Sequence, residues 1–143
     1  MLNRWIEGGL MNTCADLGLG IIAFCPLFQG LLTDKYLNGI PAGSRASIQN
    51  SPLRKNELNE QNLKVIHELN EHAKQRGQTL AQMSLSWVLR DHKVTSALIG
   101  ASNSKQILEN VKIFRQAGFS IDELHKIDRI LAKLNLPKSL WAS

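Results

Sequence analysis

The chain has 143 residues, of which 43% are hydrophobic and 20% charged, and its formal net charge is +5. These proportions indicate a globular chain rather than a disordered one, and the length suits a single domain with a buried core. No apolar run approaches the ~20 residues that cross a bilayer, so we expect no membrane span.

The basic residues are scattered, and several pair with acids at helical spacing, as in ELNEHAKQR. This pattern favours solvent-exposed helix faces over a nucleic-acid site, despite the positive charge. The start of the chain, MLNRWIEGGLMNT, lacks the layout of a secretory signal, and the cysteines Cys14 and Cys25 show no metal-ligand spacing. We expect a cytoplasmic protein with reduced thiols, no metal and no nucleic-acid partner.

The first half of the chain contains one predicted helix and one predicted strand. Apolar spacing predicts a short helix through Leu10, Met11, Cys14 and Leu17 that ends at Gly18. The apolar run GIIAFCPL, ended by Pro26, predicts a buried strand. From residue 29 to about residue 61 the periodicity is weak and Gly and Pro are frequent, which predicts a long loop with at most a short helix.

The second half contains four predicted helices and a second strand. A helix over QNLKVIHELNEHAKQRG ends at Gly77, and Thr79 with Gln82 forms a capping box for a helix that buries Leu80, Met83, Trp87 and Val88. The run VTSALIG predicts a second buried strand. A helix with Ile107, Leu108, Val111 and Phe114 on one face follows and stops near Gly118, and Ser120 with Glu123 caps a last helix that runs before Pro137.

Strands that alternate with helices indicate parallel pairing in an α/β fold. Both strands read as buried on both faces, so each needs neighbours on either side, but the chain supplies only two strands. A two-stranded parallel sheet with exposed edges is not a stable architecture. The sequence therefore predicts part of a larger α/β fold.

The turn after the second predicted strand is one candidate binding site. In GASNSKQILEN, Gly100 ends the strand, three small polar residues (Ser102, Asn103, Ser104) form the turn, and the helix that follows carries Gln106, Glu109 and Asn110 on one face. The start of a helix presents free N–H groups that favour phosphate, and the polar face could hold a ribose, a base or a phosphate. The alternative is an exposed polar face with an ordinary serine cap, and spacing alone favours this alternative.

The turn after the first predicted strand is a second candidate. Phe24 at the strand end could stack on a planar ring, Gly30 permits close backbone approach, and Lys35 and Arg45 follow as cations. The alternative is a core phenylalanine with two solvated cations. Cys25 is predicted to pack or to make a weak ligand contact rather than act as a nucleophile, since no histidine lies near it in sequence, and Tyr36 is also predicted to pack.

Two further interpretations are disfavoured. One is a metal site at the histidines, because the four histidines look like surface residues of helices or loops and show no H-x-x-x-H metal-ligand spacing. A helix-turn-helix over residues 79–111 is rejected, because the β-branched run from Val94 to Ile99 is too long for its turn.

Both turns together resemble the aldo-keto reductase family, and the whole chain is similar to its C-terminal half. The family carries S-P-L-x-x-G-x-L after a late barrel strand, and this chain reads CPLFQGLL over residues 25–32. After the last strand the family carries G-A/S-S-x-x-x-Q-L/I-x-E-N, which residues 100–110 match. KYLNGIPAGSRAS is similar to the subgroup of voltage-gated potassium-channel β-subunits and of bacterial glyceraldehyde 3-phosphate and methylglyoxal reductases.

The resemblance implies the C-terminal part of a (β/α)8 TIM barrel, with strands seven and eight and their helices, as one domain over residues 1–143. It implies NADP(H) as the cofactor, with Phe24 on the nicotinamide. Barrels bind phosphate at the loops after strands seven and eight, which agrees with this placement. The resemblance implies that the pyrophosphate is lined by Cys25, Pro26, Leu27, Phe28 and Gln29. Lys35 and Arg45 would supply positive charge to the phosphates. The adenosine end would be held by Gly100, Ser102, Gln106, Glu109 and Asn110.

Three residues depart from the family pattern. Cys25 replaces serine and is a weaker hydrogen-bond donor, Phe28 replaces a small residue, and Asp34 stands where glycine is common. The proton-donor tyrosine and its lysine, aspartate and histidine partners have no matching positions, so no residue of this chain is assigned a catalytic role. A full barrel needs about 250 residues.

The sequence therefore predicts the NADP(H)-binding portion of a reductase that converts small aldehydes or ketones to alcohols, inactive by itself. A non-catalytic nucleotide-binding or regulatory subunit and an inactive truncated product are the alternatives. Expected partners are a small carbonyl substrate in the complete enzyme and either a second copy or the missing N-terminal half.

Overall fold

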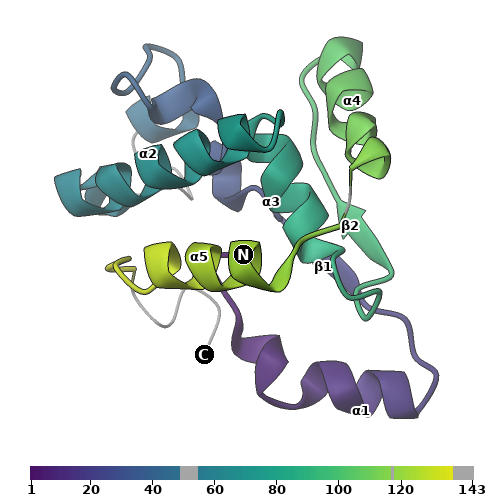
Figure 1. Ribbon diagram of the computed structural model, residues 1–143. Coiled ribbons are helices and arrows are strands. Elements are labelled where there is room, and N and C mark those ends of the chain that lie inside the picture. The colour runs from purple at the N-terminus through teal and green to yellow at the C-terminus, as the bar shows by residue number, and fades with distance from the viewer. Residues whose placement is uncertain (49–54, 117, 137–143) are drawn as a thin grey trace.

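The computed structural model describes residues 1–48, 55–116 and 118–136 of the chain. Short 3-10 turns join the longer elements. The helices are α1 (Leu10–Asp16), α2 (Glu60–Gln75), α3 (Leu80–Val88), α4 (Ser104–Val111) and α5 (Ile121–Leu131), and the strands are β1 (Ile22–Phe24) and β2 (Ser96–Leu98). Figure 1 shows α2, α3 and α5 gathered on one side, with α4 and α1 extending from the two ends of the sheet region.

The sheet consists of β1 and β2, which pair in parallel with Phe24 beside Leu98. Because side chains alternate along a strand, Ala23 and Ala97 point toward the helices and pack against the core. Ile22, Phe24 and Leu98 point the other way and are exposed. The prediction that both strands are buried on both faces is therefore wrong for the described chain, since nothing in its described residues covers this second face.

The hydrophobic core lies among α2, α3, α5 and the segments packed onto them. Apolar residues of α2 and α3 face one another, and α5 adds Ile127 and Ile130. The four residues predicted to be buried in α3 are all buried, including Trp87. The largest fully buried apolar side chains are Tyr36, Leu31, Leu32, Ile66, Leu69, Leu80, Met83, Leu85, Ile127 and Val65.

The helix boundaries follow the predicted caps. Thr79 and Gln82 form a capping box at α3, and Ser120 and Glu123 form another at α5, as the sequence predicts. Gly77 adopts a φ of +68° directly after α2, a left-handed conformation that favours glycine. The region predicted as a long loop contains only 3-10 turns among its described residues before α2 begins at Glu60, and residues 49–54 lie outside the described residues.

Two details differ from the sequence predictions. The helix α4 ends at Val111, and residues Lys112–Arg115 tighten into a 3-10 turn, so the helix does not reach Gly118. No residue of α4 is buried, and Leu108, Val111 and Phe114 are exposed. His72 is buried in α2, which corrects the prediction that all four histidines lie on the surface.

Candidate functional site

The two candidate turns leave the same edge of the sheet. Parallel pairing puts the carboxyl ends of β1 and β2 side by side, with Phe24 opposite Leu98. The segment from Cys25 to Gly30 and the segment from Ile99 to Asn103 therefore start next to one another. In α/β folds this edge is where ligands bind, because loops of several strands converge there.

The backbone after β1 is strained. Cys25, Phe28 and Gln29 have φ values of +49°, +48° and +56°, in a region that side chains other than glycine seldom adopt. Each such residue costs about 1–3 kcal/mol and persists only where the surroundings hold it, often at a binding site. The side-chain amide of Gln29 donates to the Cys25 sulfur at 3.5 Å, a contact that joins the two ends of this turn.

The side chains of this turn divide into exposed and anchored groups. Phe24 is 58% exposed at the end of β1, and Cys25 is exposed beside it. Pro26 is buried, while Leu27, Phe28 and Gln29 are half-buried. The turn is thus fixed on its inner side and presents an aromatic ring and a thiol on its outer side.

The segment after Gly30 holds the predicted cations. Leu31, Leu32 and Tyr36 are buried, so Tyr36 packs as predicted. The Thr33 hydroxyl accepts a hydrogen bond from the Lys35 N–H at 3.2 Å, which caps a 3-10 turn and leaves the Lys35 side chain exposed. Arg45 lies in a 3-10 turn, and its side chain lies outside the described residues.

The start of α4 carries a well-formed cap. Asn103, rather than a serine, caps the helix, because its side-chain oxygen accepts from the Gln106 N–H at 3.0 Å. Gln106 reaches back and accepts from the Ser102 N–H at 2.8 Å. The Gln106 side chain thus orders the turn, a function that the spacing did not reveal because amide side chains both cap helices and bind ligands.

The remaining polar residues of α4 have different surroundings. Glu109 binds Lys112 at 2.6 Å, and this hydrogen bond, together with the charge of Lys112, lowers the pKa of the Glu109 carboxyl. Asn110 is half-buried. The space where a Cβ on Gly100 would lie is open, so a bound group could approach the backbone there.

A hydrogen bond from α3 holds α4 in place. The Gln82 side chain donates to the carbonyl oxygen of Glu109 at 2.7 Å, while its own oxygen accepts from the Thr79 N–H at 3.0 Å. One buried side chain thus caps α3 and anchors α4. Gln82 was predicted only as a cap, since a partner 27 residues away gives no signal in the sequence.

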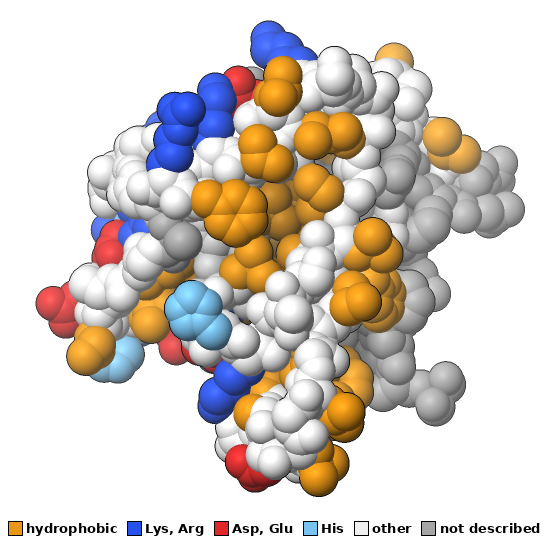
Figure 2. All heavy atoms as spheres, turned by 90° about the vertical axis from the view of Figure 1, so that its right-hand side faces the viewer, with side chains coloured by type: hydrophobic (Ala, Val, Ile, Leu, Met, Phe, Trp, Pro, Cys, Tyr) orange, Lys and Arg blue, Asp and Glu red, His pale blue; other side chains and the backbone are white. Residues whose placement is uncertain are grey.

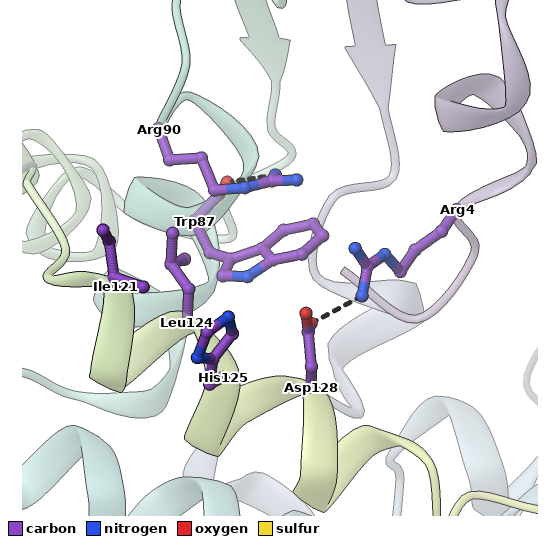
Figure 3. A pocket seen from close by; sticks show the side chains of 7 residues that line it. All are labelled: Arg4, Trp87, Arg90, Ile121, Leu124, His125 and Asp128. Atoms are coloured by element: carbon purple, nitrogen blue, oxygen red, sulfur yellow. Dashed lines mark hydrogen bonds and ion pairs between the residues drawn. The ribbon is translucent and has the colours of Figure 1, made fainter.

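A cavity of about 220 Å³ is lined by α3, α5 and the N-terminal segment rather than by either turn (Figure 3). The guanidinium carbon of Arg90 lies 3.6 Å from the centre of the Trp87 ring, and that of Arg4 lies 5.0 Å from it. Glu7 accepts from both arginines, and Arg4 also binds Asp128 at 2.6 Å. Each cation is already neutralised by a carboxylate, so this cluster joins the N-terminal segment to α3 and α5.

Within the described ranges no group of three His, Cys, Asp or Glu residues could hold a metal, and no helix is long and apolar enough to cross a membrane. The predicted cofactor residues in the turns that follow β1 and β2 at one sheet edge form the candidate site. Sequence reasoning missed Asn103 as the cap and the arginine cluster around Trp87.

Comparison with known proteins agrees with this architecture. The model of the Aldo/keto reductase family matches residues 1–132. The L-glyceraldehyde 3-phosphate reductase of Escherichia coli K12 is 50% identical over 145 residues, covering 99% of this chain and 41% of that protein. A putative voltage-gated potassium channel subunit beta of Schizosaccharomyces pombe is 36% identical over 123 residues, covering 80% of this chain and 34% of that protein.

The fold is also similar to a solved structure. A glycerol dehydrogenase from Gluconobacter oxydans superposes with a TM-score of 0.72 at 24% identity, covering 99% of this chain and 43% of that one. The chain thus spans about two fifths of the length of the curated reductases that it matches.

The fold and the family match together define an α/β protein of the TIM-barrel class. The chain belongs to the aldo/keto reductase family. Its relatives include both subgroups that the sequence resembles, the glyceraldehyde 3-phosphate reductases and the channel β-subunits.

Proposed function

We propose that the chain is the NADP(H)-binding portion of an aldo/keto reductase, from the C-terminal half of the barrel. In the complete barrel, a small aldehyde or ketone is reduced to an alcohol. The observation that carries the proposal is the pairing of Phe24 with Leu98, which brings both candidate turns to one sheet edge. The similarity to the E. coli reductase makes L-glyceraldehyde 3-phosphate the first substrate to test.

The residues at this edge suit a nicotinamide dinucleotide. An exposed Phe24 ring offers a stacking surface, and the open space at Gly100 admits a ligand close to the backbone. Lys35 carries an exposed positive charge on the segment that follows the strained turn. When bound, NADPH supplies the hydride.

Each part of the site has its own binding function in this proposal. Phe24 stacks on the nicotinamide, and residues 25–29 line the pyrophosphate. Lys35 and Arg45 balance the phosphate charge, and the capped start of α4 adds the positive end of a helix dipole. The adenosine end lies along α4 and the turn before it, against Gly100, Ser102, Gln106, Glu109 and Asn110.

The proton for the product alcohol must come from elsewhere in the barrel. Carbonyl reduction needs an acid close to the developing alkoxide. Tyr36, the one tyrosine of the chain, is 1% exposed and cannot reach a substrate at the sheet edge. We therefore expect this chain to bind the cofactor without catalysing turnover by itself.

A second candidate is a non-catalytic, nucleotide-binding regulatory subunit, favoured by the similarity to a channel β-subunit. Both candidates predict cofactor binding by this chain. They differ once the site is completed by the rest of a barrel, because only the reductase then converts NADPH and a small aldehyde to products.

Calorimetric titration of the 143-residue chain with NADPH tests cofactor binding, which both candidates predict. We expect saturable 1:1 binding that Lys35→Ala weakens about tenfold, the equivalent of ~1.4 kcal/mol. Lys64→Ala is the matched control, because Lys64 is also exposed but lies on α2 in a pair with Glu60. Absence of binding by a chain whose circular dichroism shows folded helices, or an equal loss in both variants, would contradict the proposal.

A further inference from the structure

The cavity between α3 and α5 contains a buried polar group that the described residues do not satisfy. Trp87 is 3% exposed, and its indole N–H is buried without a hydrogen-bond partner among the described residues. Buried donors are normally paired, and one left unpaired destabilises the fold. The N–H therefore indicates that an acceptor is missing from the cavity of about 220 Å³ beside it.

An acceptor faces this N–H from the other side of the cavity (Figure 3). The indole nitrogen lies on the edge of the Trp87 ring that faces α5, and the Asp128 carboxylate extends from α5 toward the same ring. The two groups are not bonded to one another, because the N–H has no partner and Asp128 instead accepts from Arg4 at 2.6 Å. A donor on one wall and an acceptor on the other leave room for one small polar group between them.

The charges around the cavity balance, and this balance determines the charge of a suitable ligand. Arg4 binds both Glu7 and Asp128, and Arg90 binds Glu7, so two cations are matched by two carboxylates. An anion would be repelled by the Asp128 carboxylate, whereas a cation would be repelled by both arginines and would offer the indole N–H no acceptor. A neutral group that both accepts and donates fits best, and a carboxamide has an oxygen and an N–H for these two walls.

The arginines also prepare the indole ring for binding. The guanidinium carbon of Arg90 lies 3.6 Å from the centre of the Trp87 ring, and that of Arg4 lies 5.0 Å from it. A cation over the ring draws electron density from the indole and makes its N–H a stronger donor. The stacked guanidinium groups also restrict the ring, so the direction of the N–H is set before a ligand arrives.

The rest of the cavity suits a small apolar group. Leu124 is half-buried in its wall, and Ile121 is 71% exposed, so the cavity opens to solvent on the side of Ile121. Its volume of about 220 Å³ is smaller than the ~300–1,000 Å³ of pockets that hold drug-sized ligands. A ligand of this cavity therefore carries no more than a short alkyl group besides its amide.

The exposed apolar surface near the sheet offers no comparable site. Figure 2 shows hydrophobic side chains gathered over the centre of the face that lies at the right of Figure 1. The exposed apolar side chains of the sheet and α4, including Ile22, Leu98 and Leu108, carry no polar group. Binding sites for small molecules combine apolar walls with a few convergent polar groups, and of these two surfaces the cavity beside Trp87 has both.

We propose that this cavity binds a small neutral amide. Its carbonyl oxygen accepts from the Trp87 indole N–H, its own N–H donates to Asp128, and its alkyl group packs on Leu124 and Ile121. Neither of the two candidate turns lines the cavity, so amide binding there is independent of the proposed cofactor binding.

Isobutyramide is the probe, and the readout is the indole N–H resonance of Trp87 in the ¹⁵N-labelled 143-residue chain. We expect a saturable downfield shift of this resonance, because a new hydrogen bond deshields the proton. A Kd of about 1 mM suits a ligand of so few atoms. The chain has three tryptophans, and the variants Trp5→Phe and Trp141→Phe assign the signal to Trp87.

Two related molecules test the polar contacts in the unchanged chain. Isobutyrate has the shape of isobutyramide but a negative charge, which Asp128 would repel. The ketone 3-methyl-2-butanone has the carbonyl and the branched group but no N–H to donate. We expect each to bind at least tenfold more weakly than isobutyramide.

A variant tests the acceptor wall. Asp128→Ala is expected to weaken isobutyramide at least tenfold, and circular dichroism shows whether the helices of this variant remain. Asp122→Ala is the matched control, because Asp122 is exposed on the same helix but does not line the cavity. If Asp128→Ala fails to fold, the ketone comparison tests the same contact in the unchanged chain.

Three results would overturn the proposal. One is a Trp87 resonance that isobutyramide leaves in place, as expected if the cavity holds only water. Another is binding of isobutyrate or the ketone as tight as that of isobutyramide. The third is a folded Asp128→Ala chain that keeps its full affinity for isobutyramide.

Discussion

Arg76 and Glu123 form an ion pair that joins the end of α2 to the first turn of α5. The Arg76 side chain is 3% exposed, and its guanidinium also donates to the Gly118 carbonyl at 2.8 Å. Burial raises the pKa of the Glu123 carboxyl, but hydrogen bonds from Ser120 and Arg76 outweigh this effect and hold the pKa below its usual value. The folded state thus depends on the charged form of Glu123.

Glu123→Gln is expected to destabilise the chain by about 2 kcal/mol. The amide keeps an acceptor for the Ser120 N–H but leaves the buried guanidinium without its counter-charge, a change that costs ~3–5 kcal/mol in fully buried pairs. The smaller value follows because the Glu123 side chain is 30% exposed, and water screens the pair. Urea denaturation measures the loss. Glu60→Gln, in an exposed pair with Lys64, is the control and should leave the midpoint unchanged.

Because His72 is buried, we expect the stability of the folded chain to depend on pH. Burial, and then the charge of Lys126, lower the pKa of the imidazole, and Arg76 lowers it further, whereas Glu123 opposes them. In the unfolded chain the imidazole has its ordinary pKa of ~6.5. Between the two pKa values the unfolded state binds more protons, so stability falls as the pH drops below about 6.5, by at most ~1.4 kcal/mol per pH unit.

Replacement of His72 isolates this contribution. Melting temperatures from pH 5 to pH 8 should fall less on acidification in His72→Gln than in the unchanged chain, whereas His125→Gln, at an exposed site, should keep the full slope. The comparison between variants is needed because burial also lowers the pKa of the Met1 amino group to about 5, so this group titrates in the same range. Parallel curves for all three proteins would contradict the assignment.

The helix layer was predictable from the sequence because its signals are local. The capping boxes at Thr79 and Ser120 and the apolar faces of α2 and α3 each lie within a few residues, and the structure contains them as expected. The sheet was less predictable. The apolar runs are longer than the three-residue strands that form, because a strand extends only where a neighbour pairs with it, and the described residues supply one partner for each strand.

The candidate site shows a second limit of prediction from the sequence. The sequence places Phe24 and Gly100 at the ends of two strands, and the structure puts these ends at one sheet edge, but the sequence does not reveal the hydrogen bonds of the turns that follow. At the start of α4 the Asn103 side chain accepts from the Gln106 N–H and the Gln106 side chain accepts from the Ser102 N–H, a choice that depends on local geometry. Gln82 reaches Glu109 across 27 residues, and such contacts become visible only once the helices are packed.

Gln82 should therefore affect α4 as well as its own helix. Thr79→Ala removes one cap and is expected to cost about 1 kcal/mol. Gln82→Ala removes the reciprocal cap and the partly buried hydrogen bond to the Glu109 carbonyl, so we expect a loss of about 2 kcal/mol. Hydrogen exchange distinguishes the variants, because the amides of α4 should exchange faster only in Gln82→Ala. Equal exchange in both would show that the contact does not hold α4.

The two cysteines provide a test of the cofactor site that does not depend on turnover. Cys25 is exposed directly after Phe24, whereas Cys14 is half-buried in α1. We expect iodoacetamide to label Cys25 faster, as located by peptide mass spectrometry. Saturating NADPH should slow the labelling of Cys25 about tenfold, because a nicotinamide stacked on Phe24 would cover the adjacent thiol, and should leave Cys14 unchanged. Equal protection of both thiols would indicate a general stiffening of the chain, and protection of neither at saturation would place the cofactor away from the turn after β1.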